Sequence, residues 1–561
     1  MRFFKKKKQS PIELDEILLD ASNLPAFNTG RLEGRLALPL SRRSIIGVGV
    51  AFTLIALVYF GQVFRLQVVR GEAYRAQSER NRLDVSLVIA SRGLISDRTG
   101  ERLAWNAEDG ESADFTSRAY TARGGLGQLL GYVQYPRKDS SGVYFRTAYE
   151  GVSGVEAAYD GVLAGENGEQ LIEIDATGAV ISSHIARESH SGESLSLTID
   201  AAFSEALYDA LSATAEEYGF RSGAAAVMDV ESGEVIALVN VPSYDPAVLA
   251  AGQDRAAIDA LRSDARLPFL NRFLSGVYTP GSVIKPFIAY AALAEGVIDA
   301  KKEIVSEGEL VVQNPYDPER PTIFRDWRAH GATDMRRAIA VSSNVYFYTI
   351  GGGYGTQQGL GISRIEKYMR HFGFGEPLRT ALADGPSGVV PNSTWKRGQF
   401  NEDWRLGDTY HTAIGQFGFQ VTPLQLLSAY GALANGGILR TPHFARGETS
   451  ASRDLGLSET HLTVIREGVR QSVQEGTARS LARSDVRIAA KTGTAEVGEG
   501  NQFINSWVAG YFPYEHPQYA FVALLEHGPR SNLFGAAPTM SRVFQWLAEE
   551  RPEYLGIELA E

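Results

Sequence analysis

The chain has 561 residues, 44% of them hydrophobic, and is therefore long enough to bury more than one core. Its net charge of −11 and its pI near 5.5 argue against binding driven by phosphate neutralisation, so we expect no nucleic-acid partner. The chain has no cysteine, which excludes disulfides, thiol nucleophiles and cysteine-ligated metals.

The N-terminal segment has the pattern of a membrane anchor. A lysine run at residues 5–8 precedes an apolar stretch that ends at Phe64. The stretch has about the 20 residues that a bilayer-spanning helix needs, and no small-residue cleavage pattern follows it. We therefore predict a retained single-pass anchor over 44–64 in the cytoplasmic membrane. The basic tail, 1–43, predicts a cytoplasmic N-terminus, with the bulk of the chain on the other, periplasmic side.

Two further domains are expected after the anchor. Residues 65–193 are predicted to form an extended β-rich domain, which we call the pedestal, with two strands around the turn in LISDRTGERLAWN and a hairpin turning at 165–168. From 194 to 549, strands at both ends enclose several helical stretches, and a tail follows at 550–561. This order predicts an α+β domain in which helices flank a central antiparallel sheet and the first strands rejoin the last.

Three short motifs follow one another in this C-terminal domain. They are Ser282-Val283-Ile284-Lys285, Ser342-Ser343-Asn344 and Lys491-Thr492-Gly493-Thr494. Positions i and i+3 share a helix face, so an amine at Lys285 can take the proton of Ser282. S-x-x-K, S-D-N and K-T-G form the set shared by penicillin-binding proteins and class A β-lactamases. Each motif is weak alone, but their order and spacing make the set specific.

With these motifs the chain resembles the class B penicillin-binding proteins, the D,D-transpeptidases of peptidoglycan synthesis. RGLISDRTGERLAWN, GVSGVEAAYDGVLAG and TAIGQFGFQVTPLQLLSAYGALANGG extend the resemblance from the anchor nearly to the C-terminus. Within the family it is most similar to the elongation type, penicillin-binding protein 2, on FRDWRAHGATDMRRAIAVSSNVYFY and WRLGDTYHTAIGQ. The division-type relative is the alternative. The resemblance implies a serine β-lactamase-like fold for the C-terminal domain.

The expected substrate is an acyl-D-alanyl-D-alanine peptide, and the motif residues suit its chemistry. Ser282 would attack the carbonyl carbon, with Lys285 as the base and Ser342 relaying a proton to the leaving amine. Asn344 would orient the substrate backbone. Backbone N–H groups of Ser282 and Thr494 are candidates for the oxyanion hole.

The third motif is expected to bind the terminal carboxylate of the substrate. Lys491 would supply positive charge near it, and the hydroxyl of Thr494 would bind it. Thr492 belongs to the same substrate-binding strand. Gly493 lacks a side chain, which would let the substrate lie along the strand.

The resemblance also implies partners. These are peptidoglycan stem peptides with lipid-linked nascent glycan, β-lactams, the membrane, a multi-span membrane glycosyltransferase of the shape, elongation, division and sporulation family, and elongation scaffold proteins. A separate glycosyltransferase is needed because 65–193 has no room for such a domain. The head of the pedestal, between Asn106 and Gly131, is shorter than usual for the family.

No cofactor and no metal are expected. Some elongation-type relatives carry a zinc site with Asp, His and Cys ligands, and Asp326 and His330 lie in the matching region, but the chain has no cysteine. We expect His330 and His411 to be structural, Asp408-Thr409 to form a packed loop, and Gly351-Gly352-Gly353 to form a loop. A class A β-lactamase, a penicillin-sensing receptor and a non-catalytic scaffold for a glycosyltransferase remain as less favoured functions.

Overall fold

The computed structural model describes residues 41–75, 83–107, 114–174, 180–314, 317–532 and 534–557. Contacts between residues divide the chain into two units, Met1–Asp84 with Ile172–Ser182, and Val85–Leu171 with Ser183–Glu561. Almost all of the predicted basic tail and the last four residues lie outside the described parts.

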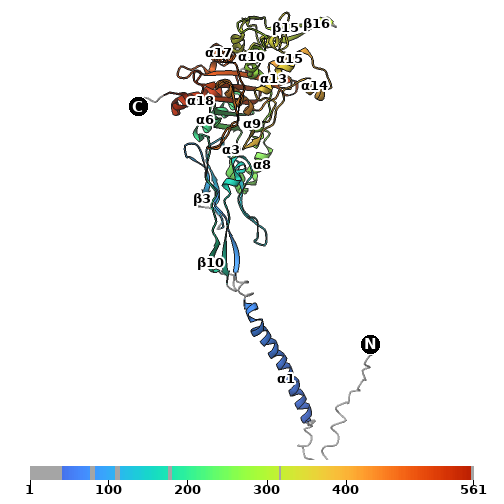
Figure 1. Ribbon diagram of the computed structural model, residues 1–561, viewed down its shortest axis with the longest axis vertical. Coiled ribbons are helices and arrows are strands. Elements are labelled where there is room, and N and C mark those ends of the chain that lie inside the picture. Colours follow the sequence, from blue (N-terminus) through green and yellow to red (C-terminus); the bar gives the residue numbers. More distant parts are fainter. Residues whose placement is uncertain are drawn as a thin grey trace, which may run out of the picture. The chain divides into compact units, whose positions relative to one another are not determined.

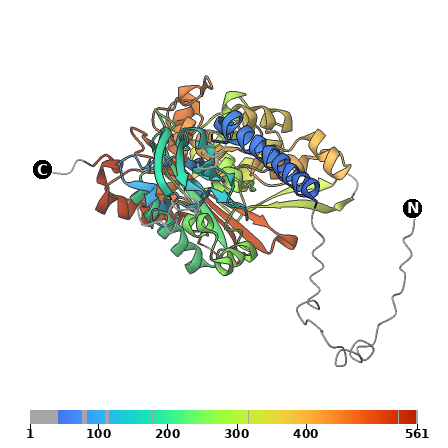
Figure 2. The same cartoon turned by 90° about the horizontal axis from the view of Figure 1, so that it is seen from below.

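The first unit contains one long apolar helix, α1 (Arg42–Phe64), which continues into a short π-helical turn, η3 (Arg65–Val69). The helix begins where Ser41 accepts a hydrogen bond from the Ser44 N–H. Its 23 residues give a length of roughly 35 Å, enough for a hydrocarbon layer about 30 Å thick. The helix runs unbroken in both views (Figure 1 and Figure 2), and none of its side chains is buried. Among the described residues, Arg42–Val69 is the one candidate membrane span.

The pedestal is built from short strands. Four form a sheet in the order β11-β2-β3-β4: β2 (Ile95–Ser96), β3 (Arg102–Ala107), β4 (Ser117–Tyr120) and β11 (Leu195–Ser196). The predicted turn between β2 and β3 is confirmed, since Ile95 pairs with Ala104 and the Asp97 carboxylate accepts hydrogen bonds from the N–H groups of Thr99 and Glu101. The other pairs are β5 (Val133–Gln134) with β8 (Glu150–Gly151) and β6 (Arg137–Lys138) with β7 (Tyr144–Arg146), and a short helix, α3 (Gly127–Leu130), precedes them.

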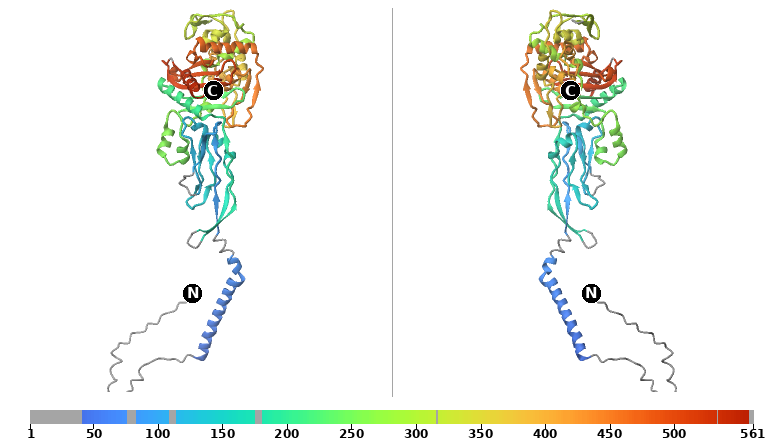
Figure 3. Two further views of the ribbon diagram at one scale, coloured as in Figure 1. Left: turned by 90° about the vertical axis from the view of Figure 1, so that its left-hand side faces the viewer. Right: turned by 90° about the vertical axis from the view of Figure 1, so that its right-hand side faces the viewer.

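The hairpin predicted at 165–168 is wrong in its position. Two short helices, α4 (Gly154–Ala158) and α5 (Asp160–Leu163), come first, and a three-stranded sheet follows with the order β1 (Leu83–Val88), β9 (Gly168–Ile174), β10 (Val180–Arg187). Figure 3 shows these strands in blue and teal, side by side. The connection between β9 and β10 falls at 175–179, outside the described residues. Gly165 instead serves a close approach, because a Cβ there would lie 2.5 Å from the carbonyl oxygen of His190.

The C-terminal domain is centred on an antiparallel sheet of five strands in the order β13-β12-β24-β23-β22. The strands are β12 (Ser222–Asp229), β13 (Val235–Val241), β22 (Ala489–Val497), β23 (Phe503–Phe512) and β24 (Tyr519–Pro529). The predicted return of the first strands to the last is confirmed, since Ala225 of β12 pairs with Ala523 of β24. The strands are apolar on both sides because the sheet is covered on both sides: Ala224 and Ala226 belong to one core, Ala225 and Val227 to the other.

Helices from distant parts of the sequence cover the two faces. On one face α6 (Ala201–Tyr218) packs beside α18 (Ala537–Glu550), as Figure 1 shows in green and red. On the other lies α16 (Pro423–Ala434), which begins with a reciprocal cap: the Gln425 N–H donates to Thr422 Oγ1, and the Thr422 N–H donates to Gln425 Oε1. Further helices are α10 (Lys285–Ala294), α11 (Met335–Val341), α12 (Asn344–Gly352), α13 (Ile362–His371), α14 (Ser393–Phe400), α15 (Leu406–Ala413) and α17 (Glu459–Glu475).

The smaller elements of the domain are short helices and two-stranded ribbons. The helices are α7 (Pro246–Ala251), α8 (Arg255–Ser263) and α9 (Arg272–Ser275). The ribbons are β14 (Ile304–Ser306) with β17 (Gly331–Thr333), β15 (Glu309–Asn314) with β16 (Asp317–Arg325), β18 (Arg379–Thr380) with β19 (Ala383–Asp384), and β20 (Ile438–Arg440) with β21 (Ser452–Asp454).

Two loop predictions in this domain are wrong. Gly351 and Gly352 are the last residues of α12, not a loop, and only Gly353 lies beyond it. A Cβ at Gly352 would lie 2.4 Å from Cε1 of Tyr410, so the glycine allows α12 to pack closely on α15. Asp408-Thr409 is also helical, in the first turn of α15, where the buried Asp408 carboxylate accepts a hydrogen bond from Lys396.

Candidate active site

The first motif lies at the start of α10. Ser282 is half-buried in a short 3-10 turn, η4 (Gly281–Ile284), and Lys285 is the first residue of α10 and fully buried. Gly281 has a φ of +58°, and a Cβ there would lie 2.5 Å from the carbonyl oxygen of Thr494. The glycine before the serine therefore lets η4 approach strand β22 closely. Proline at position 286 suits the first turn of the helix, where no N–H partner is needed.

The structure brings the second motif onto the Lys285 amine. Its Nζ donates to the carbonyl oxygen of Ser342 at 2.8 Å, to Ser342 Oγ at 3.2 Å and to Asn344 Oδ1 at 2.7 Å. Burial lowers the pKa of Lys285 to about 7, against the opposing charge of Asp326. A large fraction of the amine is therefore neutral near neutral pH, the form that a general base requires.

The Ser-Ser-Asn motif occupies a break between two helices, α11 and α12. Ser342 ends α11 in the left-handed conformation, with a φ of 59°, and Ser343 is the N-cap of α12. The left-handed residue reverses the chain so that Ser342 and Asn344 both face Lys285. Asn344 Nδ2 also donates to the carbonyl oxygen of Arg325 at 3.4 Å.

The third motif lies on β22, the edge strand of the sheet, as predicted. A Cβ at Gly493 would lie 2.9 Å from both the Pro280 carbonyl oxygen and Val283 Cγ1. The glycine is therefore required by the packing of η4 on the strand, a reason different from the expected room for substrate. Thr494 is exposed, whereas the Thr492 hydroxyl donates to Thr477 Oγ1 at 2.6 Å.

Lys491 is fully buried, and its Nζ donates to the carbonyl oxygen of Thr492 at 2.9 Å. Burial, and then the charge of Lys285, lower the pKa of Lys491 well below its usual range. The site therefore holds less positive charge than the sequence suggested. An arriving carboxylate would favour the protonated form again, because an opposite charge nearby stabilises the ammonium.

Asp326, which the sequence analysis weighed as a possible zinc ligand, also contacts the second motif. The Asp326 side chain is fully buried, and its Oδ2 accepts hydrogen bonds from Ser343 Oγ at 2.8 Å and from the Val345 N–H at 3.0 Å. Ser343 and Val345 follow Asp326 by 17 and 19 residues in the sequence. These separations match neither the helix period nor the strand period. Spacing therefore carried no signal for this contact.

The residues present do not fit a zinc ion. Both oxygens of Asp326 are engaged, and His330 Nε2 lies 3.5 Å from Asp326 Oδ1. In the described ranges, no group of three or more His, Cys, Asp or Glu side chains is placed to hold a metal. Burial lowers the pKa of His330, which keeps its imidazole neutral, and its side chain is only 2% exposed. Its ring packs edge-on against Trp327, with the ring centroids 5.1 Å apart.

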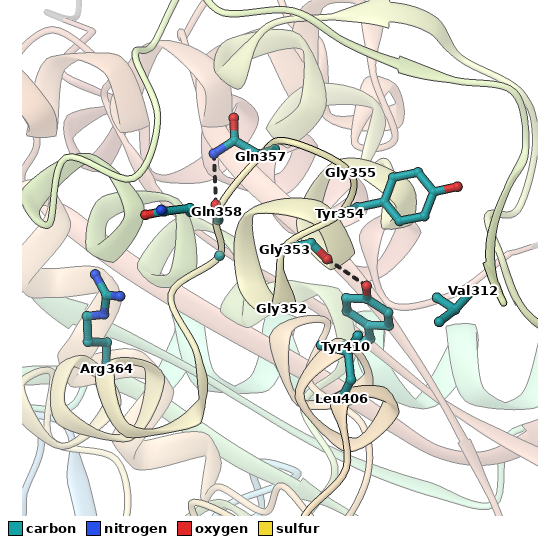
Figure 4. Close-up of a pocket in the computed structure, with 11 residues that line it drawn as sticks. Val312, Gly352, Gly353, Tyr354, Gly355, Gln357, Gln358, Arg364, Leu406 and Tyr410 are labelled. Atoms are coloured by element: carbon teal, nitrogen blue, oxygen red, sulfur yellow. Dashed lines mark hydrogen bonds between the residues drawn. The ribbon is translucent and has the colours of Figure 1, made fainter. Parts of the chain in front are cut away.

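A separate pocket of about 510 Å³ lies at the other end of α12 (Figure 4). Gly353, Tyr354, Gln358, Arg364 and Tyr410 are among the residues that line it, and the Tyr410 hydroxyl donates to the Gly353 carbonyl oxygen. None of the three motifs contributes to it. The pocket is therefore distinct from the motif cluster around Lys285.

Comparison with known proteins agrees with the family resemblance that the three motifs indicate. Residues 223–545 match the penicillin-binding protein transpeptidase domain, and residues 111–197 match the penicillin-binding protein dimerisation domain. The peptidoglycan D,D-transpeptidase MrdA of Haemophilus influenzae is 27% identical, over 91% of this chain and 92% of the relative. The division-type relative, FtsI of Escherichia coli, is 27% identical over only 69% of this chain and 61% of its own length.

Solved structures are similar over most of the chain. The complex between penicillin-binding protein PBP2 and MreC from Helicobacter pylori has a TM-score of 0.69 and 26% identity, and covers 84% of this chain and 99% of that one. A structure that describes the coordination of polymerization and crosslinking by a peptidoglycan synthase complex has a TM-score of 0.71 and 26% identity, and covers 93% of this chain and 100% of that one.

The transpeptidase match spans more than half of the chain, and the chain therefore belongs to the penicillin-binding protein transpeptidase family. The long curated and structural matches place it among the class B proteins of the penicillin-binding protein 2 type. It is a serine-type peptidoglycan D,D-transpeptidase of cell-wall elongation. The division-type alternative is not favoured.

Proposed function

We propose that Ser282 is the acylated nucleophile of this transpeptidase and that Lys285 is its general base. The observation that carries the proposal is the buried Lys285 amine, one helical turn from Ser282 and hydrogen-bonded to Ser342 and Asn344. A neutral amine has two N–H donors and one lone pair. In that form Nζ donates to the two nearer of its three acceptors, the Ser342 carbonyl oxygen and Asn344 Oδ1, and its lone pair is left for the Ser282 proton.

The acylation step then follows from these positions. Ser282 Oγ bonds to the carbonyl carbon of the penultimate D-alanine, and its proton passes to Lys285 Nζ. The C–N bond to the terminal D-alanine breaks, and the leaving amine receives a proton through the Ser342 hydroxyl, which lies 3.2 Å from Nζ. An amine of a second stem peptide attacks the acyl-enzyme, releases Ser282 and forms the cross-link.

Substrate binding is assigned to the strand that faces η4. The exposed Thr494 hydroxyl binds the terminal carboxylate, Lys491 supplies a proton and charge beneath it, and Asn344 orients the peptide backbone. The close approach of Gly281 to the Thr494 carbonyl supports Ser282 and Thr494 as the two oxyanion N–H donors, because it brings their chain segments next to one another. Thr492 and Gly493 fix the strand, through Thr477 and η4, so that its edge is free to pair with an extended peptide.

The anchor and the partners complete the proposal. The apolar helix and the basic tail before it support a single-pass topology with a cytoplasmic N-terminus and a periplasmic catalytic domain. The relatives that were solved with MreC and within a peptidoglycan synthase complex support an elongation scaffold protein and a membrane glycosyltransferase as partners. The substrates are stem peptides of lipid-linked nascent glycan, and β-lactams acylate the same serine.

The experiment is labelling of the purified full-length protein with a fluorescent penicillin, beside Ser282→Ala. We expect a covalent band that persists for many minutes in the wild type and is absent from the variant. A transient band with release of hydrolysed drug would indicate a β-lactamase instead. No band from folded wild-type protein would overturn the catalytic assignment.

A further inference from the structure

The last residue of β16, Arg325, and the two residues after it form hydrogen bonds with the junction between α11 and α12. The Arg325 carbonyl oxygen accepts from Asn344 Nδ2 at 3.4 Å, and Trp327 Nε1 donates to the Val341 carbonyl oxygen at 3.2 Å. Between them lies the fully buried carboxylate of Asp326. We call Arg325–Trp327 the clamp segment, because it holds both ends of the Ser342-Ser343-Asn344 motif.

The Asp326 carboxylate is the centre of this contact. Besides Ser343 Oγ and the Val345 N–H, Ser306 Oγ donates to its Oδ2 at 3.2 Å, and the Trp327 N–H donates to its Oδ1 at 2.9 Å. The bonds from Ser343 and Val345 come from the first turn of α12, where free N–H groups and the helix dipole favour an anion. A carboxylate from a different element thus supplements the Ser343 cap of α12.

The same carboxylate is ionised despite its burial. Burial opposes ionisation, but hydrogen bonds from the Val345 and Asn344 N–H groups and from the Ser343 hydroxyl hold the pKa of Asp326 below its usual range. The charged group that acts on Lys285 is therefore Asp326, whose charge favours the ammonium, and Lys285 in turn lowers the pKa of Lys491. His330, behind Asp326, stays neutral because burial lowers its pKa.

We propose that Asp326 is a positioning residue for acylation: by fixing the start of α12 it holds Ser342 and Asn344 at hydrogen-bond distance from Lys285. Asp326 itself makes no hydrogen bond to Lys285 and does not touch the reacting atoms. It acts through Ser343 and Val345, the neighbours of the two residues that accept from the amine. This inference rests on the proposed roles of Ser282 and Lys285.

The test compares Asp326→Asn with a matched variant in full-length protein. Asp334→Asn changes the same group at the N-cap of the neighbouring helix α11, where Asp334 Oδ1 accepts from the Arg337 N–H, away from Lys285. The rate constant of penicillin acylation is measured across pH, together with the thermal unfolding midpoint. We expect Asp326→Asn to lower the maximal rate by about 10- to 100-fold, the usual result of misplaced catalytic groups, and Asp334→Asn to leave it within about twofold.

The pH profile shows whether the Asp326 charge acts at Lys285, independently of how much protein is folded. Loss of the Asp326 charge removes an interaction that favours the Lys285 ammonium, so the rising limb of the profile moves to lower pH in Asp326→Asn. A purely structural role would lower the amount of folded protein without moving that limb. A limb that does not move and a rate equal to that of Asp334→Asn would overturn the inference.

Ser343→Ala keeps the test decisive if Asp326→Asn does not fold. It removes the hydroxyl bond to Asp326 but leaves the carboxylate in place, so we expect a lower rate with an unmoved pH limb. A rate equal to wild type in this variant would overturn the inference. Absence of acylation in wild type would instead overturn the proposed function on which it rests.

Discussion

Nζ of Lys285 lies 2.7 Å from Oδ1 of Asn344, a residue 59 positions further along the chain. The contact joins the first residue of α10 to the first residue of α12, so both side chains start from helix N-termini that are fixed by neighbouring elements. Because the amine is fully buried, it depends on these few acceptors to satisfy its N–H donors. Changes in the packing of this cluster should therefore appear directly in the rate of acylation.

Penicillin acylation of the wild-type protein is expected to rise with pH through a midpoint near 7. Burial lowers the pKa of Lys285 to about 7, and only the deprotonated amine accepts the Ser282 proton. The acylation rate constant is measured from pH 5 to 9 with a fluorescent penicillin. A rate constant that stays low up to pH 9 would mean that the lysine has the pKa of an exposed amine and is not the base.

Lys491→Met is expected to weaken acylation by a carboxylate-bearing penicillin. Lys491 lies on the same strand as Thr494, β22. A charged hydrogen bond to the ligand contributes roughly 1.5–3 kcal/mol, equivalent to a loss of about 10- to 100-fold. The weaker acylation is measured from the dependence of the labelling rate on penicillin concentration. Lys301→Met is the matched control, since Lys301 is an exposed lysine outside the site. Equal labelling of the two variants would remove Lys491 from carboxylate binding.

Gly493→Ala is expected to impair both folding and acylation. The added Cβ would meet the Pro280 carbonyl oxygen and Val283 Cγ1 at 2.9 Å, and overpacking of this kind costs about 1–3 kcal/mol. Relief requires η4 to move away from β22, which displaces Ser282. Gly398→Ala is the control, because Gly398 lies in α14 and a Cβ added there would have no atom within 4 Å. If Gly493→Ala were labelled as fast as Gly398→Ala, the strand would tolerate movement of η4.

Much of this site followed from sequence because local rules govern its parts. The Ser282–Lys285 spacing and the turn between β2 and β3 each depend on residues close together in the chain. What could not be derived depends on three-dimensional neighbours. The break at Ser342 needs a left-handed serine inside an apolar run, and the contact of Asp326 with α12 joins segments with no shared periodicity. Gly352 and Gly493 stand out in the sequence, but the contacts that require a glycine at these positions come from elements that are distant in the chain.

Glu156→Gln is expected to destabilise the pedestal strongly. The Glu156 carboxylate is fully buried, with Arg92 Nε at 2.6 Å from one oxygen and Arg118 Nε at 2.8 Å from the other. Removal of its charge takes away the carboxylate partner of the buried Arg118 and leaves Arg92 with Asp160, 2.7 Å away, as its remaining partner. Breaking a buried pair in this way costs about 3–5 kcal/mol.

The control is Glu150→Gln, which changes a carboxylate that is 58% exposed and paired with Arg146 at 3.0 Å. Exposed pairs contribute about 0–1 kcal/mol, so its thermal midpoint should stay near that of wild type. Limited proteolysis then locates the loss of stability, because cleavage should begin within the pedestal in Glu156→Gln. Penicillin should still label the C-terminal domain of this variant at low temperature, because Ser282 and Lys285 do not contact Glu156. Identical midpoints for the two variants would show that solvent reaches the buried arginines and replaces the carboxylate.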